Sequence, residues 1–188
     1  MSVRKIVAFE QVSLDGFFVD AKGDMGWAHK QDAEWNAFTA GNASGEGGLL
    51  FGRKTYEMMA GFWTSPMAMR VAPEVAEGMN KLQKTVFSRT LQSASWNNTA
   101  LMKGDLLATV KALKEQPGPD MVILGSGTLV SQLAQEGLID EFQIIVNAVI
   151  VGQGRTLFEG VTRKIALKLL KTRAFSNGNV ILYYAPAA

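Results

Sequence analysis

Three short stretches place glycine, hydroxyl and basic residues where an apolar run gives way to a turn or a helix. They follow the runs LLF, TVF and MVIL, and in chain order they are Gly52-Arg53-Lys54-Thr55, Ser88-Arg89-Thr90 and Gly125-Ser126-Gly127-Thr128. The start of a helix carries unpaired N–H groups and a partial positive charge, so junctions of this kind bind anions such as phosphate. Glycine lets the backbone approach a ligand closely, and the planar arginine fork matches phosphate geometry.

Each junction also has a purely structural interpretation. Taken singly, the first is a tight turn with a solvated cation and a capping threonine, the second is a common loop pair, and the third is a flexible turn that ends in a cap. The stretch GSGTLV is not a dinucleotide fingerprint either, because it lacks the third glycine and comes late in the chain. Together on one sheet edge, however, the three describe a site for a pyrophosphate-bridged dinucleotide, since ligands of open α/β sheets bind beyond the strand ends.

The elements that position these junctions alternate between strand-like and helix-like patterns. Short continuous apolar runs such as LLF and MVIL are typical of parallel strands covered on both faces. Two alternating runs near 165–174 and 179–185 are joined across Ser176-Asn177-Gly178, which predicts an antiparallel hairpin. The sequence therefore predicts one α/β domain over residues 1–188, with a mixed, mostly parallel sheet between two helical layers. Expected strands are near 3–12, 47–52, 84–88, 121–124 and 141–151, and expected helices near 32–40, from 55, 73–82, 105–115 and 128–136.

Composition excludes several classes of function. The 188 residues are 47% hydrophobic and carry a net charge of +2, which is too small for a general nucleic-acid-binding field. Without cysteine and with the single histidine His29, the chain has no thiolate nucleophile and no multi-histidine metal site. Glu10 and Asp15 interrupt the N-terminal apolar run, and no stretch reaches the ~18 apolar residues of a membrane span. We therefore expect a cytoplasmic protein without a metal, a membrane or a nucleic-acid partner.

Several motifs resemble the dihydrofolate reductase superfamily. They are FGRKTYE, VFSRTL and ILGSGTLVSQLAQEGLIDEF, and they occur in the order of that family. Within the superfamily, VSLDGFF and LIDEF followed by VIVGQGRTLFEG are most similar to the reductase domain (RibD C-terminal-like) of the bifunctional riboflavin-biosynthesis deaminase/reductase and its stand-alone bacterial relatives. The resemblance covers nearly the whole chain and implies a dihydrofolate reductase-like fold and an NADPH-dependent oxidoreductase.

The resemblance also assigns residues to the cofactor. It implies that Ser88 and Arg89 meet the 2′-phosphate of NADPH, where an NAD site would place an acid instead of a cation. It implies that the first junction meets the phosphate bridge and that the third lines a second helix terminus. The residues so assigned are Gly52, Arg53, Lys54, Thr55, Gly125, Ser126, Gly127, Thr128 and Leu129.

A proton source for the reduction is predicted at Asp32. Trp27 lies five residues before it and Trp35 three residues after it, a spacing that resembles the folate-reducing pattern. A carboxylate held against an indole would have a raised pKa, which suits a proton donor. The alternative is that Asp32 only caps its helix. His29 lies close enough in sequence to reach the same pocket, and the expected substrate contacts are Gln11, Trp27, Trp35 and Asn147.

The leading hypothesis is a reductase resembling the 5-amino-6-(5-phosphoribosylamino)uracil reductases, with hydride transfer to a C=N or C=O group of a small heterocyclic or sugar-linked substrate. One alternative is a dihydrofolate reductase that uses Asp32. Another is a non-catalytic module that binds NADPH or a pterin. Relatives in the riboflavin branch pair, and MAMRVAPEVAEGM and IALKLL offer apolar surface, so we also expect a homodimer.

Overall fold

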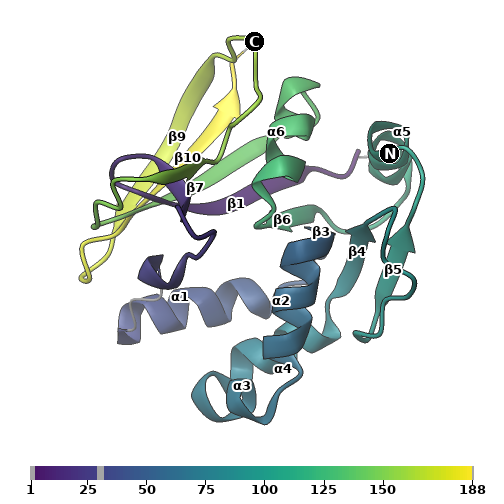
Figure 1. The fold of residues 1–188 in the computed structure, drawn as a ribbon, viewed down its shortest axis with the longest axis horizontal. Helices are drawn as coiled ribbons and strands as arrows, with labels where there is room; N and C mark the ends of the chain where they lie inside the picture. Colours follow the sequence, from purple (N-terminus) through teal and green to yellow (C-terminus); the bar gives the residue numbers. More distant parts are fainter. Residues whose placement is uncertain (1–2, 29–31, 188) are drawn as a thin grey trace.

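The computed structural model describes residues 3–28 and 32–187. Its centre is an eight-stranded sheet in the order β5-β4-β3-β6-β1-β7-β10-β9 (Figure 1). Strands β1 and β3 to β7 pair in parallel, while β10 runs antiparallel to both β7 and β9. The predicted mixed sheet with a C-terminal antiparallel hairpin is therefore confirmed. The strands are β1 (Ile6–Ser13), β3 (Gly48–Gly52), β4 (Gln83–Phe87), β5 (Thr99–Met102), β6 (Met121–Leu124), β7 (Glu141–Asn147), β9 (Leu167–Ala174) and β10 (Val180–Pro186).

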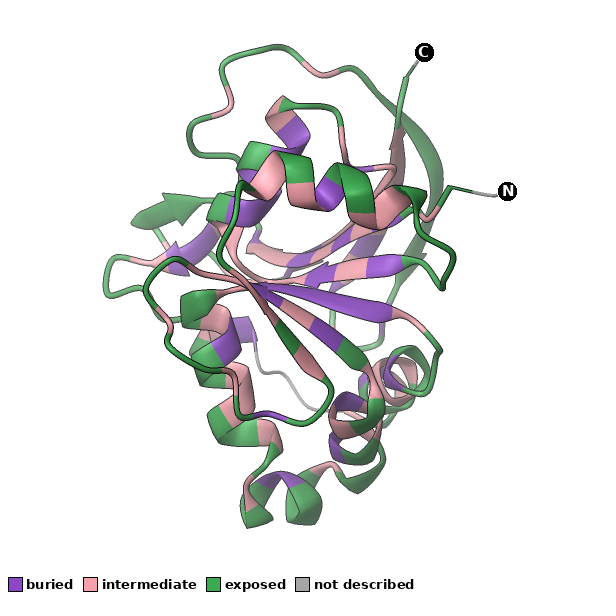
Figure 2. Ribbon diagram, turned by 90° about the vertical axis from the view of Figure 1, so that its right-hand side faces the viewer, coloured by how far each residue is buried: buried purple, intermediate pink, exposed green. Residues whose placement is uncertain are grey.

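Helices cover the two faces of this sheet, as the sequence predicts. Because side chains alternate along a strand, Leu50 of β3 packs into the core under α5 and α6, while Leu49 and Phe51 pack against α2 and α4. Figure 1 shows α1 to α4 on one side of the sheet and α5 and α6 on the other, and Figure 2 shows buried residues concentrated in the strands between them. The helices are α1 (Ala33–Ala43), α2 (Arg53–Trp63), α3 (Pro66–Val71), α4 (Pro73–Lys81), α5 (Leu106–Glu115) and α6 (Gly127–Gln135).

Some short elements are absent from the sequence prediction. Strands β2 (Phe17–Asp20) and β8 (Gly154–Thr156) form a separate two-stranded sheet, and a 3₁₀ turn, η1, covers Gly26–Ala28. Strand β5 and helix α3 were not expected either. These elements have three to six residues, too few for a hydrophobic period to stand out. Among the described residues, no helix is long and apolar enough to cross a bilayer.

A close contact between α1 and α4 gives a testable consequence for stability. In an open helix position alanine is favoured over glycine by ~1 kcal/mol, yet a methyl group on Gly78 of α4 would lie 2.9 Å from the carbonyl carbon of Ala43, and closer still to its oxygen. We therefore expect Gly78→Ala to destabilise the fold by about 1–3 kcal/mol. Beyond its own helix backbone and chain neighbours, Gly61 of α2 has no atom within 4 Å of its added methyl group, so Gly61→Ala is the matched control and should be neutral or stabilising. Urea unfolding measures the free energy of unfolding of both variants. A Gly78→Ala variant more stable than the unmodified protein would contradict this packing.

Candidate cofactor and substrate site

Helices α2 and α6 both begin without a side-chain cap. Asp32, Ser65 and Asp105 accept a hydrogen bond from an N–H of the first turn of α1, α3 and α5. Like Ala72 before α4, Gly52 before α2 and Ser126 before α6 make no such bond. Since a cap contributes about 0.5–2 kcal/mol, two uncapped helices at one edge of the sheet leave their first N–H groups available to a ligand.

These two helix starts lie directly against each other. A methyl group on Gly52 would lie 3.2 Å from Cβ of Ser126 and would collide with its hydroxyl oxygen, while one on Gly125 would lie 3.1 Å from Cγ2 of Thr55. Gly125 and Ser126 have φ values of +72° and +85°. A positive φ is unusual for serine and marks a backbone conformation that the surrounding structure enforces. The structure thus brings together the first and third junctions that the sequence singled out.

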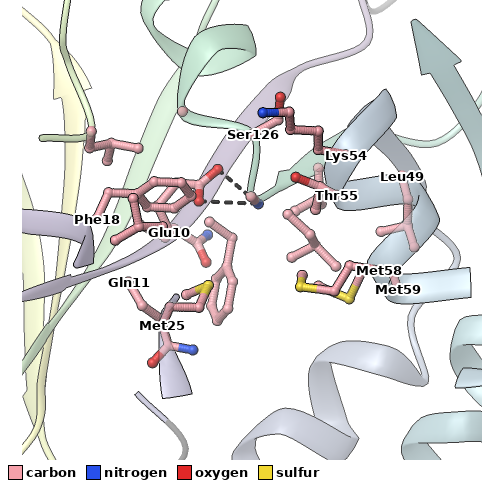
Figure 3. A pocket seen from close by; sticks show the side chains of 18 of the residues that line it. Glu10, Gln11, Phe18, Met25, Leu49, Lys54, Thr55, Met58, Met59 and Ser126 are labelled. Carbon is pink, nitrogen blue, oxygen red and sulfur yellow. Dashed lines mark hydrogen bonds between the residues drawn. The ribbon is translucent and has the colours of Figure 1, made fainter. Parts of the chain in front are cut away.

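A cavity of about 830 Å³ opens from this pair of helix starts. Its polar end includes Lys54, Thr55 and Gly125 to Thr128, and its body runs between the sheet and helices α1, α2 and α4 (Figure 3). Arg155 of β8 also lines it. A cavity with convergent polar groups at one end and an apolar body suits a dinucleotide together with a planar heterocycle. The apolar body is formed by Val7, Phe9, Leu49, Met59, Trp63, Val75, Met79, Val122 and Leu124.

Glu10 is a buried carboxyl group in the wall of this cavity. It is 2% exposed, and both of its oxygens accept the N–H of Gly125, at 3.0 and 3.1 Å. Burial raises the pKa of Glu10 well above its ordinary value, although the Gly125 N–H opposes the shift. Glu10 was not predicted from the sequence as a site residue. The available signal was a carboxylate in an otherwise apolar strand, on the face that Ile6 and Ala8 bury.

Asp15 holds together two loops beside the cavity. Its carboxylate accepts hydrogen bonds from the Ser13 hydroxyl at 2.6 Å, from the Val151 N–H at 3.1 Å and from the Gly152 N–H at 2.8 Å. The Ser13 hydroxyl and these backbone donors lower the pKa of Asp15 to about 2. The motifs VSLDGFF and VIVGQGR therefore meet in space, and the turn at Asp15-Gly16 leads into Phe18, which lines the cavity.

The cations predicted to contact the cofactor are placed differently from one another. Lys54 lines the cavity, whereas Arg53 is paired with Glu57 at 3.2 Å on the surface of α2 and does not line it. Ser88 and Arg89 follow β4, whose Phe87 pairs with Gly52, so they emerge beside the start of α2. Ser88 accepts the Leu91 N–H at 2.9 Å, and Arg89 is exposed. Leu129 is buried in the core behind the helix start.

Asp32 lies at the N-terminus of α1 and does not line the cavity. Its Oδ1 accepts the Trp35 N–H at 2.8 Å, which is a capping contact, while Oδ2 is buried and has no partner among the described residues. The indole N–H of Trp27 is likewise buried and without a partner in the described part of the chain. Trp35 packs in an aromatic cluster, 5.2 Å from Phe175 between ring centroids. His29 lies outside the described residues.

Gln11 and Asn147 lie at different depths. Gln11 lines the cavity, whereas Asn147 is fully buried behind it. The Asn147 side-chain amide donates to Oε1 of Gln11 at 3.3 Å and to the Val12 carbonyl at 3.2 Å, and its oxygen accepts from Asn179 at 3.0 Å. Asn147 therefore orients Gln11 from behind.

Comparison with known proteins agrees with this architecture. The family model of the RibD C-terminal domain matches residues 4–181. The uncharacterised protein YyaP of Bacillus subtilis (strain 168) is 31% identical over 186 residues, which are 96% of this chain and 94% of YyaP.

Two solved structures share the fold. A protein from Shewanella sp. PV-4, provisionally named for riboflavin biosynthesis, superposes with a TM-score of 0.74 at 20% identity, over 98% of this chain and 99% of its own. The diaminohydroxyphosphoribosylaminopyrimidine deaminase/5-amino-6-(5-phosphoribosylamino)uracil reductase of Thermotoga maritima superposes with a TM-score of 0.71 at 13% identity, over 98% of this chain but 57% of its own. The chain belongs to the RibD C-terminal domain family, reductase-like proteins with a fold of the dihydrofolate reductase type.

Proposed function

We propose that the chain is an NADPH-dependent reductase that transfers hydride to a C=N or C=O group of a small heterocyclic or sugar-linked substrate. The observation that carries the proposal is the contact between two uncapped helix starts, α2 and α6, at the mouth of a cavity that Lys54 also lines. Two phosphates bridged by oxygen need N–H donors and a cation from two directions, and this arrangement offers both. The residues present therefore fit NADPH.

The side chains around the cavity have separable roles in this proposal. A bound nicotinamide cofactor supplies the hydride, and the protein supplies orientation and a dry, shaped site. Lys54 and the first N–H groups of α2 and α6 hold the phosphates. The apolar body formed by the sheet, α1, α2 and α4 receives the ring of the substrate and excludes water. Gln11, oriented by Asn147, supplies an amide for a polar substituent.

Under the same proposal, the substrate class is inferred from the names of the structural relatives. The Thermotoga maritima protein is named as a 5-amino-6-(5-phosphoribosylamino)uracil reductase, and we propose a substrate of that kind. Under this proposal Arg155, which lines the cavity, contacts the ribose phosphate of the substrate. Loss of NADPH absorbance with this substrate, compared with dihydrofolate, tests the assignment.

A dihydrofolate reductase is the second candidate, and one observation favours it. Asp32 Oδ2 and the Trp27 indole N–H are both buried without partners among the described residues, as an acceptor and a donor shared with a ligand would be. In that case Asp32→Asn loses dihydrofolate turnover while the cap to Trp35 survives. Tight NADPH binding without turnover of either substrate would favour the third candidate, a non-catalytic binding module.

Cofactor preference gives a direct prediction at Arg89. The residue follows β4 beside the start of α2, and no acid accompanies Ser88-Arg89 to hold a free ribose hydroxyl. Arg89→Ala should weaken NADPH binding by ~1.5–3 kcal/mol, the contribution of a hydrogen bond to a charged group, and leave NADH binding nearly unchanged. Fluorescence titration with both cofactors measures this difference. Equal losses for the two cofactors would mean that Arg89 does not meet the 2′-phosphate.

We also propose that the protein is a homodimer. All eight residues of the edge strand β9 are exposed, including Leu167, Leu169 and Leu170. The α3 segment adds the exposed side chains of Met67 and Met69. Light scattering at micromolar concentration should give twice the chain mass of 20.4 kDa, and a mass of one chain would refute the proposal.

A further inference from the structure

Glu10 is a buried acid in the wall of the cavity, and no cation among the described residues pairs with it. The other charged residues that line the cavity are Asp24, Lys54, Arg155 and Glu159. Within residues 3–28 and 32–187, none of these four forms a hydrogen bond or an ion pair with Glu10, whose described partner is the Gly125 N–H. A carboxylate that is 2% exposed without a cation is destabilised relative to the neutral acid, and the raised pKa of Glu10 agrees with this expectation.

The neutral acid has one hydrogen-bonding group to spare. One oxygen accepts the Gly125 N–H, and the other then carries a proton for which no acceptor is seen among the described residues. Figure 3 shows the carboxyl group of Glu10 between Phe18 and the loop that leads into Ser126, at the wall of the cavity. An O–H group in this position donates to whatever acceptor a ligand brings there.

We propose that Glu10 is the proton donor of the reduction, an inference that rests on the proposed reductase function. The incoming hydride brings two electrons to the carbon of a C=N or C=O group, and the π pair of that bond moves to its nitrogen or oxygen. The O–H bond of Glu10 breaks, its electrons remain on the carboxylate, and its proton bonds to that heteroatom. The substrate becomes CH–NH or CH–OH, the nicotinamide is left oxidised, and Glu10 regains a proton from solvent water.

Two variants test Glu10 against the acid that the sequence predicts. Glu10→Gln keeps the shape of the side chain and an acceptor for Gly125 but has no transferable proton. Asp32→Asn tests the competing acid, because it also removes one carboxylate and keeps a capping oxygen for the Trp35 N–H. Circular dichroism and thermal unfolding establish whether both variants remain folded.

The first readout does not depend on activity. Infrared spectroscopy of the protein at neutral pH should show the C=O stretch of a protonated carboxyl group. The band should persist in Asp32→Asn and disappear in Glu10→Gln. It should fade in the unmodified protein as the pH rises through the raised pKa of Glu10. A spectrum of the unmodified protein without this band at neutral pH overturns the proposal, even if the variants fail to fold.

The second readout is the single-turnover oxidation of NADPH with 5-amino-6-(5-phosphoribosylamino)uracil, or with dihydrofolate if that probe is reduced instead. Glu10→Gln should slow the reduction by about 10²–10⁴-fold, the usual effect of a positioned acid, and should remove the decline of the rate at high pH. NADPH affinity should remain within about twofold. A slower reduction in Asp32→Asn with an unchanged rate in Glu10→Gln would assign the proton to Asp32 and overturn the proposal. An unchanged rate in Glu10→Gln overturns the role of Glu10 as proton donor but leaves the proposed reductase function in place. Failure of the unmodified protein to bind NADPH overturns the proposed function and this inference with it.

Discussion

Gly52→Val is expected to weaken NADPH binding by about 100-fold, because it should separate the two helix starts that hold the phosphates. The branched side chain would begin at a position that already lies 3.2 Å from Cβ of Ser126 and collides with its hydroxyl oxygen. The loop that leads into α6 must then move away from α2. The fold should survive, since Gly52 is the last residue of β3 and is only partly buried. Fluorescence titration of NADPH gives the affinity, and urea unfolding gives the stability.

A second substitution provides the control for this contact. Ser126 has a φ of +85°, a conformation that glycine adopts without strain, so Ser126→Gly should be neutral or stabilising. In the double variant Gly52→Val with Ser126→Gly, the collision is partly relieved, and part of the lost affinity should return. If Gly52→Val binds NADPH as tightly as the unmodified chain, the contact between the helix starts has no part in cofactor binding.

Lys54→Glu should weaken NADPH by about 100-fold, since it replaces a charged hydrogen bond with repulsion between a carboxylate and phosphate. Arg53→Glu is the matched variant. Arg53 precedes Lys54 directly, but it is paired with Glu57 on the helix surface and does not line the cavity, so its loss should cost about threefold or less. Isothermal titration of NADPH into the two variants compares them. A loss of NADPH affinity in Arg53→Glu as large as that in Lys54→Glu would show that Arg53 leaves Glu57 and contacts the phosphate.

The fold was largely predictable from local patterns. Continuous apolar runs such as LLF and MVIL indicated parallel strands covered on both faces, and the alternating C-terminal pair indicated the hairpin of β9 and β10. The small β2–β8 sheet could not be found in this way. Its pairing depends on contacts between segments more than 130 residues apart, such as Phe17 with Thr156, and neither segment is long enough to show a period.

The site was only partly predictable, for a reason of geometry. Glycine and threonine at the two helix starts were identified from their position after strands, and the structure places Gly52 against Ser126 and Thr55 against Gly125. A sequence does not show which of two neighbouring cations turns toward a cavity. It also does not show that Glu10, within an apolar strand, meets the Gly125 N–H from a position 115 residues away.

The most direct test of the cofactor site is a titration of the ¹⁵N-labelled protein with NADPH, followed by the backbone amide signals. If the paired helix starts hold the phosphates, the first-turn amides of α2 (Arg53, Lys54 and Thr55) and of α6 (Gly127 and Thr128) should shift together and saturate. Those of the side-chain-capped α5, beginning at Leu106, should stay in place. Absence of saturable shifts, or shifts confined to segments away from both helix starts, would contradict the assignment of this cavity to NADPH.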